Sequence, residues 1–179
     1  MTDLSVDDAF NPGYLMGLDR LPLAQLRAKR ESCAQLEMEL SYVRRLAQAR
    51  IDLIMAESER RHQGLFEQSS EIMVEQLPQI LGDHSRGDGP GRLSNFLAPS
   101  EGVQTSLAAR VDEVLPSDRL GSLAEMSPEE LDMMLDSLSS LERDISAERR
   151  GLHDIQDHLQ EELIRRYQSG EATVDALLH

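Results

Sequence analysis

Five polar residues recur with identical spacing in two segments of the chain, and their types suit nucleotide recognition. The pattern is Glu-x3-Ser-x2-Arg-x3-polar-x3-Asp. On a helix, at about 100° per residue, each copy falls within roughly 80° of arc and forms one narrow polar stripe. The copies lie 105 residues apart (Glu37 to Glu142), a whole number of heptads. The first copy is Glu37, Ser41, Arg44, Gln48 and Asp52, and the second is Glu142, Ser146, Arg149, His153 and Asp157.

These side chains match the donors and acceptors of guanine. A carboxylate accepts two hydrogen bonds from the N1–H and N2–H2 edge of guanine, and an Arg fork fits O6 and N7 or phosphate oxygens. Ser and Gln or His can reach ribose hydroxyls, phosphates or remaining base atoms. Arg45, Arg50 and Arg150 flank the stripes and could offset phosphate charge. A doubled stripe with twofold symmetry would suit a symmetric guanine dinucleotide.

A plainer interpretation stays open on residue chemistry alone. A Glu-Ser-Arg-Gln-Asp stripe can be a solvated helix face with i,i+3 and i,i+4 pairs. The repetition favours a binding site, because solvated faces do not normally repeat their chemistry at a fixed offset.

Catalytic and metal-binding alternatives have weaker support. Glu59-x2-His62 has the spacing of a di-iron helix motif, but such a site needs a second pair and further Glu ligands, and no second Glu-x2-His occurs. Asp154 and His158 lie one turn apart and could be weak metal ligands, or exposed polar residues. Cys33 is expected to be a small core residue. No nucleophile elbow, phosphate loop or dinucleotide-binding glycine motif is present, so we expect no catalysis.

The residues available for a core are those of helical coiled coils. Among 179 residues there is no Trp, and there are three Phe and three Tyr. Scarce aromatic and β-branched residues and the absence of strict alternation disfavour strands. The sequence predicts an all-α fold: a long antiparallel two-helix coiled coil with short intervening helices and a flexible linker.

Four segments follow from the positions of Pro, Gly and charge. We expect a mostly flexible acidic arm over 1–20, a long helix with the first motif over 21–63, and a long helix with the second motif over 127–169. The intervening 64–126 should hold short helices at about 65–81 and 104–115 and a Gly/Pro/Ser-rich linker at 82–103. Ser127 as a cap, with Pro128 in the first turn, marks the start of the second long helix.

Each long helix carries an apolar seam with spacings near three and four. Gly151 interrupts the second helix and leaves room for close approach of a ligand or another backbone. In an antiparallel pair the stripes would be related by an approximate twofold axis, as two half-sites on one surface. The first seam is Leu26, Cys33, Leu36, Leu40, Val43, Ala47, Ile51 and Ile54; the second is Leu131, Leu138, Leu141, Ile145, Leu152, Ile155 and Leu159, with Met134 and Leu135. The 105-residue offset also matches Leu26, Ser32, Leu36, Arg45, Glu57, Arg60 and Arg61 with Leu131, Ser137, Leu141, Arg150, Glu162, Arg165 and Arg166.

The overall charge bears on partners. A net charge of −15 argues against direct nucleic-acid binding and suits a partner with a basic face. A single Cys fits a reducing compartment. Neither a secretory signal nor an apolar run of membrane-spanning length is found, so we expect a cytoplasmic protein.

The doubled motif resembles the cyclic-di-GMP-binding signature of the RsiG family, the anti-sigma factors of sporulating filamentous actinobacteria, whose partner is the sigma factor WhiG. The first copy fits completely. In the second copy His153 stands where the pattern has Gln. A His can donate or accept as Gln does.

The resemblance implies a transcription regulator rather than an enzyme. Such a coiled coil binds two molecules of cyclic-di-GMP and, when loaded, sequesters a WhiG-like sigma factor as a 1:1 heterodimer. By the match, each copy of the motif would contact one ligand. The predicted middle helix, with Ile72, Met73, Leu77 and Ile80, would either contact sigma or pack on the coiled coil. The rival hypothesis is a coiled-coil scaffold or adaptor without a ligand.

Overall fold

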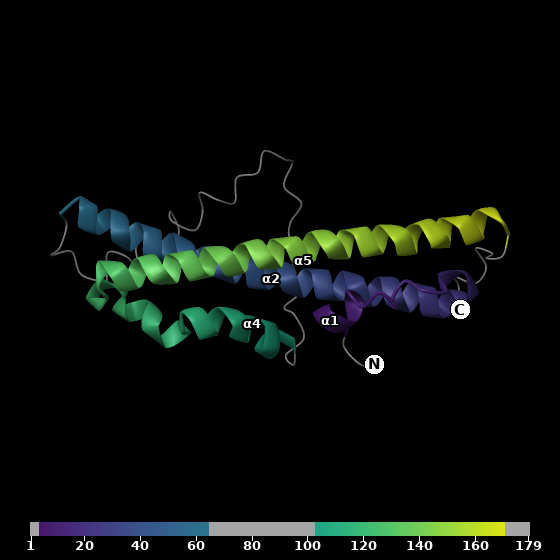
Figure 1. Cartoon of the computed structure of the whole chain (residues 1–179), viewed down its shortest axis with the longest axis horizontal. Helices are drawn as coiled ribbons and strands as arrows, with labels where there is room; N and C mark the ends of the chain where they lie inside the picture. Colours follow the sequence, from purple (N-terminus) through teal and green to yellow (C-terminus); the bar gives the residue numbers. More distant parts are fainter. Residues whose placement is uncertain (1–3, 65–102, 171–179) are drawn as a thin grey trace. The chain divides into compact units, whose positions relative to one another are not determined.

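The computed structural model describes residues 4–64 and 103–170, and the regular structure in these ranges is helical (Figure 1). The long helices are α2 (Leu23–His62) and α5 (Pro128–Gln168). Shorter elements precede each of them: α1 (Val6–Ala9) and the 3-10 helix η1 (Leu18–Arg20), then α4 (Val103–Val114) and the 3-10 helix η3 (Ser117–Glu125). The predicted all-α fold is confirmed. The helix predicted at 65–81 and the linker at 82–103 lie outside the described ranges, except for residue 103.

Local sequence accounts for the ends of the long helices. At the start of α5, the Glu130 amide donates to Ser127 Oγ at 3.2 Å and the Ser127 amide donates to the Glu130 carboxylate at 2.8 Å. This reciprocal capping box satisfies two amides that the first turn would leave without partners. Gly64 follows α2 and Gly170 follows α5, with φ of 72° and 77°. A left-handed residue after a helix favours Gly, because other side chains are strained there.

The 105-residue repeat extends to the bounds of the elements. Helix α1 ends at Ala9 and α4 at Val114; η1 ends at Arg20 and η3 at Glu125; α2 begins at Leu23 and α5 at Pro128. Each of these pairs differs by 105 positions. The described residues therefore contain two repeats of a short helix, a 3-10 segment and a long helix.

The chain divides into two compact units, and each unit combines both repeats. Unit 1 comprises residues 1–41 and 146–179, and unit 2 comprises residues 42–145. Unit 1 thus joins the first part of α2 to the last part of α5, and unit 2 joins the remaining parts. In unit 1, Arg27 contacts Tyr167 and Glu37 contacts Arg149, so the helices run antiparallel.

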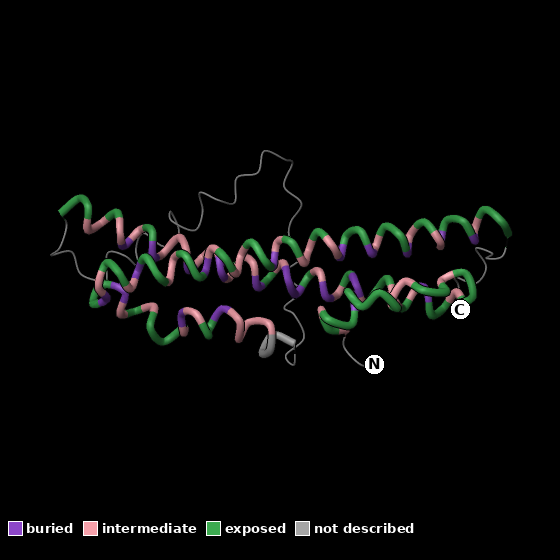
Figure 2. Tube along the Cα trace, in the orientation of Figure 1, coloured by how far each residue is buried: buried purple, intermediate pink, exposed green. Residues whose placement is uncertain are grey.

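The same direction holds in unit 2, where Arg44 contacts Glu142 and Arg61 contacts Leu123. Buried positions recur along α2 and α5 at the predicted spacing (Figure 2). The seam prediction is confirmed, with Ile51, Met134, Leu135 and Leu141 half-buried rather than buried. In unit 1 the apolar core is Ala9, Leu26, Cys33, Leu36, Leu40, Leu152, Ile155, Leu159 and Leu163. In unit 2 it is Val43, Ala47, Ile54, Val111, Leu115, Leu123, Met126, Leu131, Leu138 and Ile145.

A buried carboxylate holds the end of α2 in unit 2. The fully buried Glu57 side chain accepts from Arg60 Nε at 2.8 Å and from Arg61 Nε at 2.6 Å. Arg61 also donates to the carbonyl of Leu123 in η3 at 2.8 Å. Burial acts to raise the pKa of Glu57, but the hydrogen bonds from the two arginines outweigh it and lower the pKa.

Unit 1 repeats this arrangement at the equivalent positions. Glu162 accepts from Arg165 Nε and Arg166 Nε, both at 2.8 Å, and these hydrogen bonds lower the pKa of Glu162 to about 2. Arg166 then donates to the carbonyls of Leu18 and Leu21, which frame η1. The matched Glu-x2-Arg-Arg residues therefore connect α2 to η3, which precedes α5, and connect α5 to η1, which precedes α2.

The N-terminal residues differ from the flexible arm expected from their composition. The Phe10 ring packs against the α5 backbone, where a Cβ built on Gly151 would lie 2.4 Å from it. Lys29 Nζ lies 3.6 Å from the centre of the Tyr14 ring and donates to the Tyr14 carbonyl at 2.8 Å. Gly151 therefore admits a close approach, as its position suggested, but the group that approaches is an aromatic side chain of the chain itself.

Candidate ligand site

In unit 1 the two copies of the motif meet at Glu37. Its Oε1 accepts from Arg149 Nη2 at 2.6 Å and Nε at 3.0 Å, and from Ser41 Oγ at 2.8 Å. His153 Nε2 lies 3.8 Å from the same oxygen. Glu37 and Ser41 come from α2, whereas Arg149 and His153 come from α5, so antiparallel packing creates the cluster.

The charge of Glu37 follows from these contacts. Burial acts to raise the pKa of this carboxyl, but the hydrogen bonds from Arg149 and Ser41 prevail and lower it. Near neutral pH the side chain is therefore a carboxylate that can only accept hydrogen bonds. Such a group suits a ligand edge with two adjacent N–H donors.

Unit 2 contains the same cluster with the copies exchanged. Arg44 Nη1 donates to Glu142 Oε1 at 2.9 Å, and Gln48 Nε2 donates to the same oxygen at 3.4 Å. Glu142 is the equivalent of Glu37, and Arg44 is the equivalent of Arg149. In each unit, the Glu of one copy thus accepts from the Arg of the other copy.

The remaining motif residues follow the same division. Ser146 and Asp157 belong to unit 1, and Asp52 belongs to unit 2. Ser146 and Asp52 are half-buried, while Asp157 is exposed. Each copy of the motif is thus shared between the units, and the contacts within each unit join residues of both copies. The assignment of one copy to each ligand stays a prediction. The pairing of the Glu of one copy with the Arg of the other was not predicted from the sequence, although it follows from the antiparallel register.

The arginines that flank the motif have different surroundings. Arg45 and Arg150 are exposed. Arg50 is 2% exposed and donates to the Leu115 carbonyl, to the Asp112 carboxylate and to Ser117 Oγ. The expectation that Arg50 offsets ligand charge is therefore wrong, because this side chain is buried and holds the end of α4.

The weaker candidate sites are engaged in local contacts. His62 Nδ1 lies 2.7 Å from the Ser58 carbonyl, and His158 Nδ1 lies 2.7 Å from the Asp154 carbonyl. Gln63 donates to Glu59 at 2.7 Å. No group of three or more His, Cys, Asp or Glu with metal-binding geometry occurs in residues 4–64 and 103–170. Cys33 is buried in the core, as predicted.

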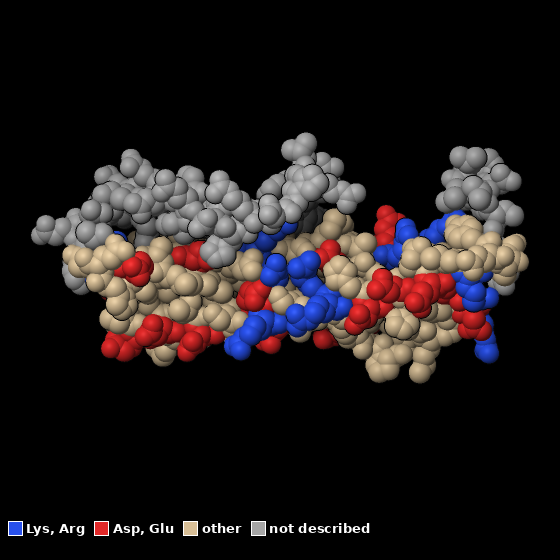
Figure 3. All heavy atoms as spheres, turned by 90° about the horizontal axis from the view of Figure 1, so that it is seen from above, with Lys and Arg blue, Asp and Glu red and all other residues tan. Residues whose placement is uncertain are grey.

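Cationic side chains are clustered on the surface despite the acidic net charge. Figure 3 shows patches of Lys and Arg that border patches of Asp and Glu on one face. Local positive charge of this kind can attract an anion even when the protein as a whole repels it.

Comparison with protein families gives a match over the first part of the chain. Residues 12–81 match the family model described as RsiG-like, and this range includes the whole first copy of the motif. No curated protein matches the chain. None of the helices in the described ranges combines the length and the apolar content needed to cross a membrane.

Proposed function

We propose, from the premise that residues 12–81 are RsiG-like, that the chain is an anti-sigma factor controlled by cyclic-di-GMP. The family match indicates an anti-sigma role and a sigma-factor partner, rather than an enzyme. The finer proposal is that two molecules of cyclic-di-GMP load the protein and that the loaded form sequesters a WhiG-like sporulation sigma factor in a 1:1 complex.

The observation that carries the ligand proposal is the reciprocal Glu–Arg pair. Glu37 accepts two N–H groups of the Arg149 guanidinium. The N1–H and N2–H2 edge of guanine carries the same kind of donors, because that edge is itself part of a guanidine group. Glu37 therefore already accepts from a donor pair of the type that guanine would present, and Glu142 accepts from Arg44 Nη1 and Gln48 Nε2.

Ligand binding would exchange one partner for another. A guanine edge on Glu37 releases Arg149 to meet guanine O6 and N7 or a phosphate oxygen. The Arg149 and Glu37 side chains are 25% and 19% exposed, so separating them costs less than breaking a fully buried pair. Unit 2 would make the same exchange with Arg44 and Glu142.

Acidic charge supports the partner proposal. Sigma factors present basic promoter-binding surfaces, and a net charge of −15 favours association with them. If cyclic-di-GMP strengthens the grip on sigma, linkage requires sigma to strengthen the binding of cyclic-di-GMP by the same factor.

Calorimetric titration tests the proposal. Purified chain is titrated with cyclic-di-GMP, alone and with a WhiG-like sigma factor, and cyclic-di-AMP is the control ligand. We expect cyclic-di-GMP to bind, sigma to tighten it, and cyclic-di-AMP to bind much more weakly. Equal cyclic-di-GMP affinities with and without sigma would refute the coupling.

A ligand-free scaffold is the second candidate. It is favoured by one observation: Glu37 pairs with Arg149, and Glu142 with Arg44, across the helices without a ligand. If the chain binds no nucleotide even with sigma present, the scaffold function is correct.

A further inference from the structure

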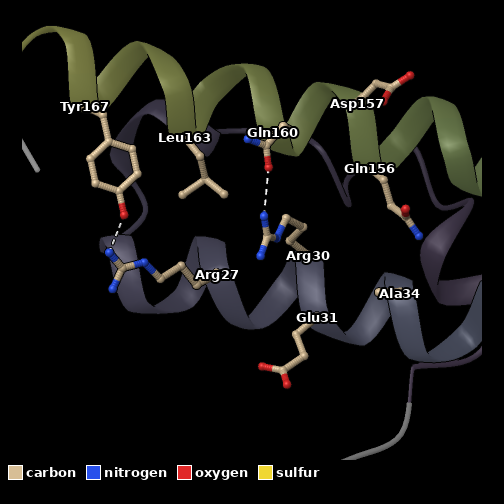
Figure 4. Close-up of a pocket in the computed structure, with 9 residues that line it drawn as sticks. All are labelled: Arg27, Arg30, Glu31, Ala34, Gln156, Asp157, Gln160, Leu163 and Tyr167. Carbon is tan, nitrogen blue, oxygen red and sulfur yellow. Dashed lines mark hydrogen bonds between the residues drawn. The ribbon is translucent and has the colours of Figure 1, made fainter. Parts of the chain in front are cut away.

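A groove in unit 1 lies between α2 and α5 (Figure 4). Two of its lining residues, Ala34 and Gln156, lie three positions along the helix from Glu37 and His153 of the cluster. Its volume is about 720 Å³, within the range of small-molecule sites. Arg27 and Arg30 reach into it from α2, and Gln160 and Tyr167 reach into it from α5. The space is large enough for part of a nucleotide.

The interior of the groove is rich in hydrogen-bond donors. Arg30 Nη1 donates to Gln160 Oε1 at 2.8 Å, and Arg27 donates to the Tyr167 hydroxyl. Gln156 Nε2 is buried and has no hydrogen-bond partner among the described residues. The carboxylates of Glu31 and Asp157 line the groove but point away from the space between the helices (Figure 4). A ligand that fits this interior must supply acceptors, and phosphate oxygens are strong ones.

The groove continues the face of unit 1 that carries the motif. At about 100° per residue, Arg149, Gln160 and Tyr167 fall within roughly 20° of one another on α5. Their partners on α2 are Glu37, Arg30 and Arg27 in the reverse order, as antiparallel packing requires. A ligand bound at Glu37 therefore lies along the same line of contacts as the groove.

The internal repeat does not keep the residues that line this groove. At the 105-residue offset, Leu135 corresponds to Arg30 and Met55 corresponds to Gln160. Both are apolar, and Asp132 stands at the equivalent of Arg27. The Glu–Arg pair is thus kept in both units, whereas the donors beside it occur in unit 1 alone.

We infer that the groove extends the ligand site of unit 1, takes phosphate oxygens of the bound messenger through Arg30 and Gln160, and makes unit 1 the tighter of two unequal sites. This inference rests on the proposed function. Arg30 is the main contact because its hydrogen bond goes to a neutral amide oxygen, so it can turn to a phosphate without leaving a carboxylate. Unit 2 has no such cation at the equivalent position.

The test isolates each site in the full-length chain. Glu142→Gln removes the carboxylate of unit 2 and Glu37→Gln removes that of unit 1, and cyclic-di-GMP affinity is measured by calorimetry. The paired change Arg30→Leu with Gln160→Met gives the groove the residues found in unit 2. We expect this pair to weaken binding about tenfold or more in the Glu142→Gln chain and to leave the Glu37→Gln chain within about twofold.

Arg20→Leu is the matched control, because it removes the same charge from an 89% exposed side chain of unit 1 outside the groove. It should change affinity less than about twofold. Equal effects of the groove pair in both backgrounds, or no effect in either, would overturn the inference. If neither single-Glu chain binds, the groove pair and Arg20→Leu are each introduced into the unaltered chain. The groove pair should then weaken cyclic-di-GMP binding, whereas Arg20→Leu should not. Equal affinities of the two variants would overturn the inference. A complete lack of cyclic-di-GMP binding by the unaltered chain would instead refute the proposed function.

Discussion

At the scale of single residues, two carboxylates and two arginines define the candidate site. Glu37 with Arg149, and Glu142 with Arg44, form equivalent pairs between α2 and α5. The third member differs, since His153 stands in unit 1 where Gln48 stands in unit 2. The carboxylates should matter most for choosing guanine, because an ionised carboxylate only accepts hydrogen bonds, whereas Arg, Ser, Gln and His side chains also carry donors.

Glu37→Gln combined with Glu142→Gln tests this role. An amide presents one acceptor and one donor, and its donor would oppose the N–H groups of guanine. We expect cyclic-di-GMP binding to fall by at least about tenfold per site, the value of a lost charge-assisted hydrogen bond. Circular dichroism should show unchanged helicity. Retained affinity in the double variant would remove the carboxylates from the site.

The residue types of the site could be predicted from the sequence, but their partners could not be read from one helix at a time. Once Glu37 lies opposite Arg149, an antiparallel register places Arg44, seven residues later, opposite Glu142, seven residues earlier. The groove was missed because Arg27, Arg30 and Tyr167 fall outside the repeated pattern. Arg50 was misassigned because its burial depends on α4, which approaches from elsewhere in the sequence.

At the scale of elements, the helix caps and the contacts of the N-terminal residues decide local stability. The capping box at Ser127 is the clearest sequence signal that the structure confirms. Replacing Ser127 by Ala should lower the free energy of unfolding by about 1 kcal/mol, because the Glu130 amide loses its acceptor. Urea unfolding measures this, with exposed Ser140→Ala on the same helix as the control. Equal losses for the two variants would show that the cap does not stabilise the helix.

Gly151 gives a second test at this scale. Gly→Ala within a helix normally stabilises by about 1 kcal/mol, but here the added Cβ would lie 2.4 Å from the Phe10 ring. Gly151→Ala alone should therefore lower the free energy of unfolding. In the Phe10→Ala background the ring is absent, so Gly151→Ala should instead raise the free energy of unfolding. A double-mutant cycle by urea unfolding gives the coupling. No coupling would show that Phe10 does not pack on Gly151 in solution.

Acid should weaken the Glu-x2-Arg-Arg contacts. The pKa of Glu162 is lowered from 4.5 to about 2 by Arg165 and Arg166, so its stabilisation is complete above about pH 4.5 and is lost as pH falls toward 2. Glu162→Gln should therefore flatten the fall in unfolding free energy over this range. Glu125→Gln, at an exposed position, is the control. An unchanged pH profile for Glu162→Gln would contradict the contact.

Periodicity and capping residues made the two long helices predictable, because those signals are local. The 3-10 segment η3 and the packing of residues 4–20 were not predictable in the same way. They depend on single long-range contacts, such as Arg61 with the Leu123 carbonyl and Phe10 with Gly151. Neither segment has a sequence pattern that predicts such a partner.

At the scale of the whole molecule, the repeat gives two units with one plan and different surroundings. Both keep a Glu–Arg pair, but Arg30 and Gln160, which line the groove of unit 1, are replaced by Leu135 and Met55 at the equivalent positions of unit 2. The expectation that both stripes form one surface stays a prediction. The net charge of −15 applies to the chain as a whole and should act mainly on partner encounter.

Association with a WhiG-like sigma factor should therefore depend on salt. Raising ionic strength shortens the range of attraction between the acidic chain and a basic surface, so the association rate should fall. Stopped-flow measurements with cyclic-di-GMP present, at several salt concentrations, check this. A rate independent of salt would argue against electrostatic steering.

The central claim is that the crossed Glu–Arg pairs are the place where cyclic-di-GMP binds. Calorimetry of the full chain with sigma, comparing the unaltered protein with Arg44→Ala/Arg149→Ala, tests it most directly. Both arginines lie off the apolar seam, so helicity should remain nearly unchanged, and circular dichroism checks this. We predict saturable binding to the unaltered protein and none to the double variant; equal binding to both would contradict the claim.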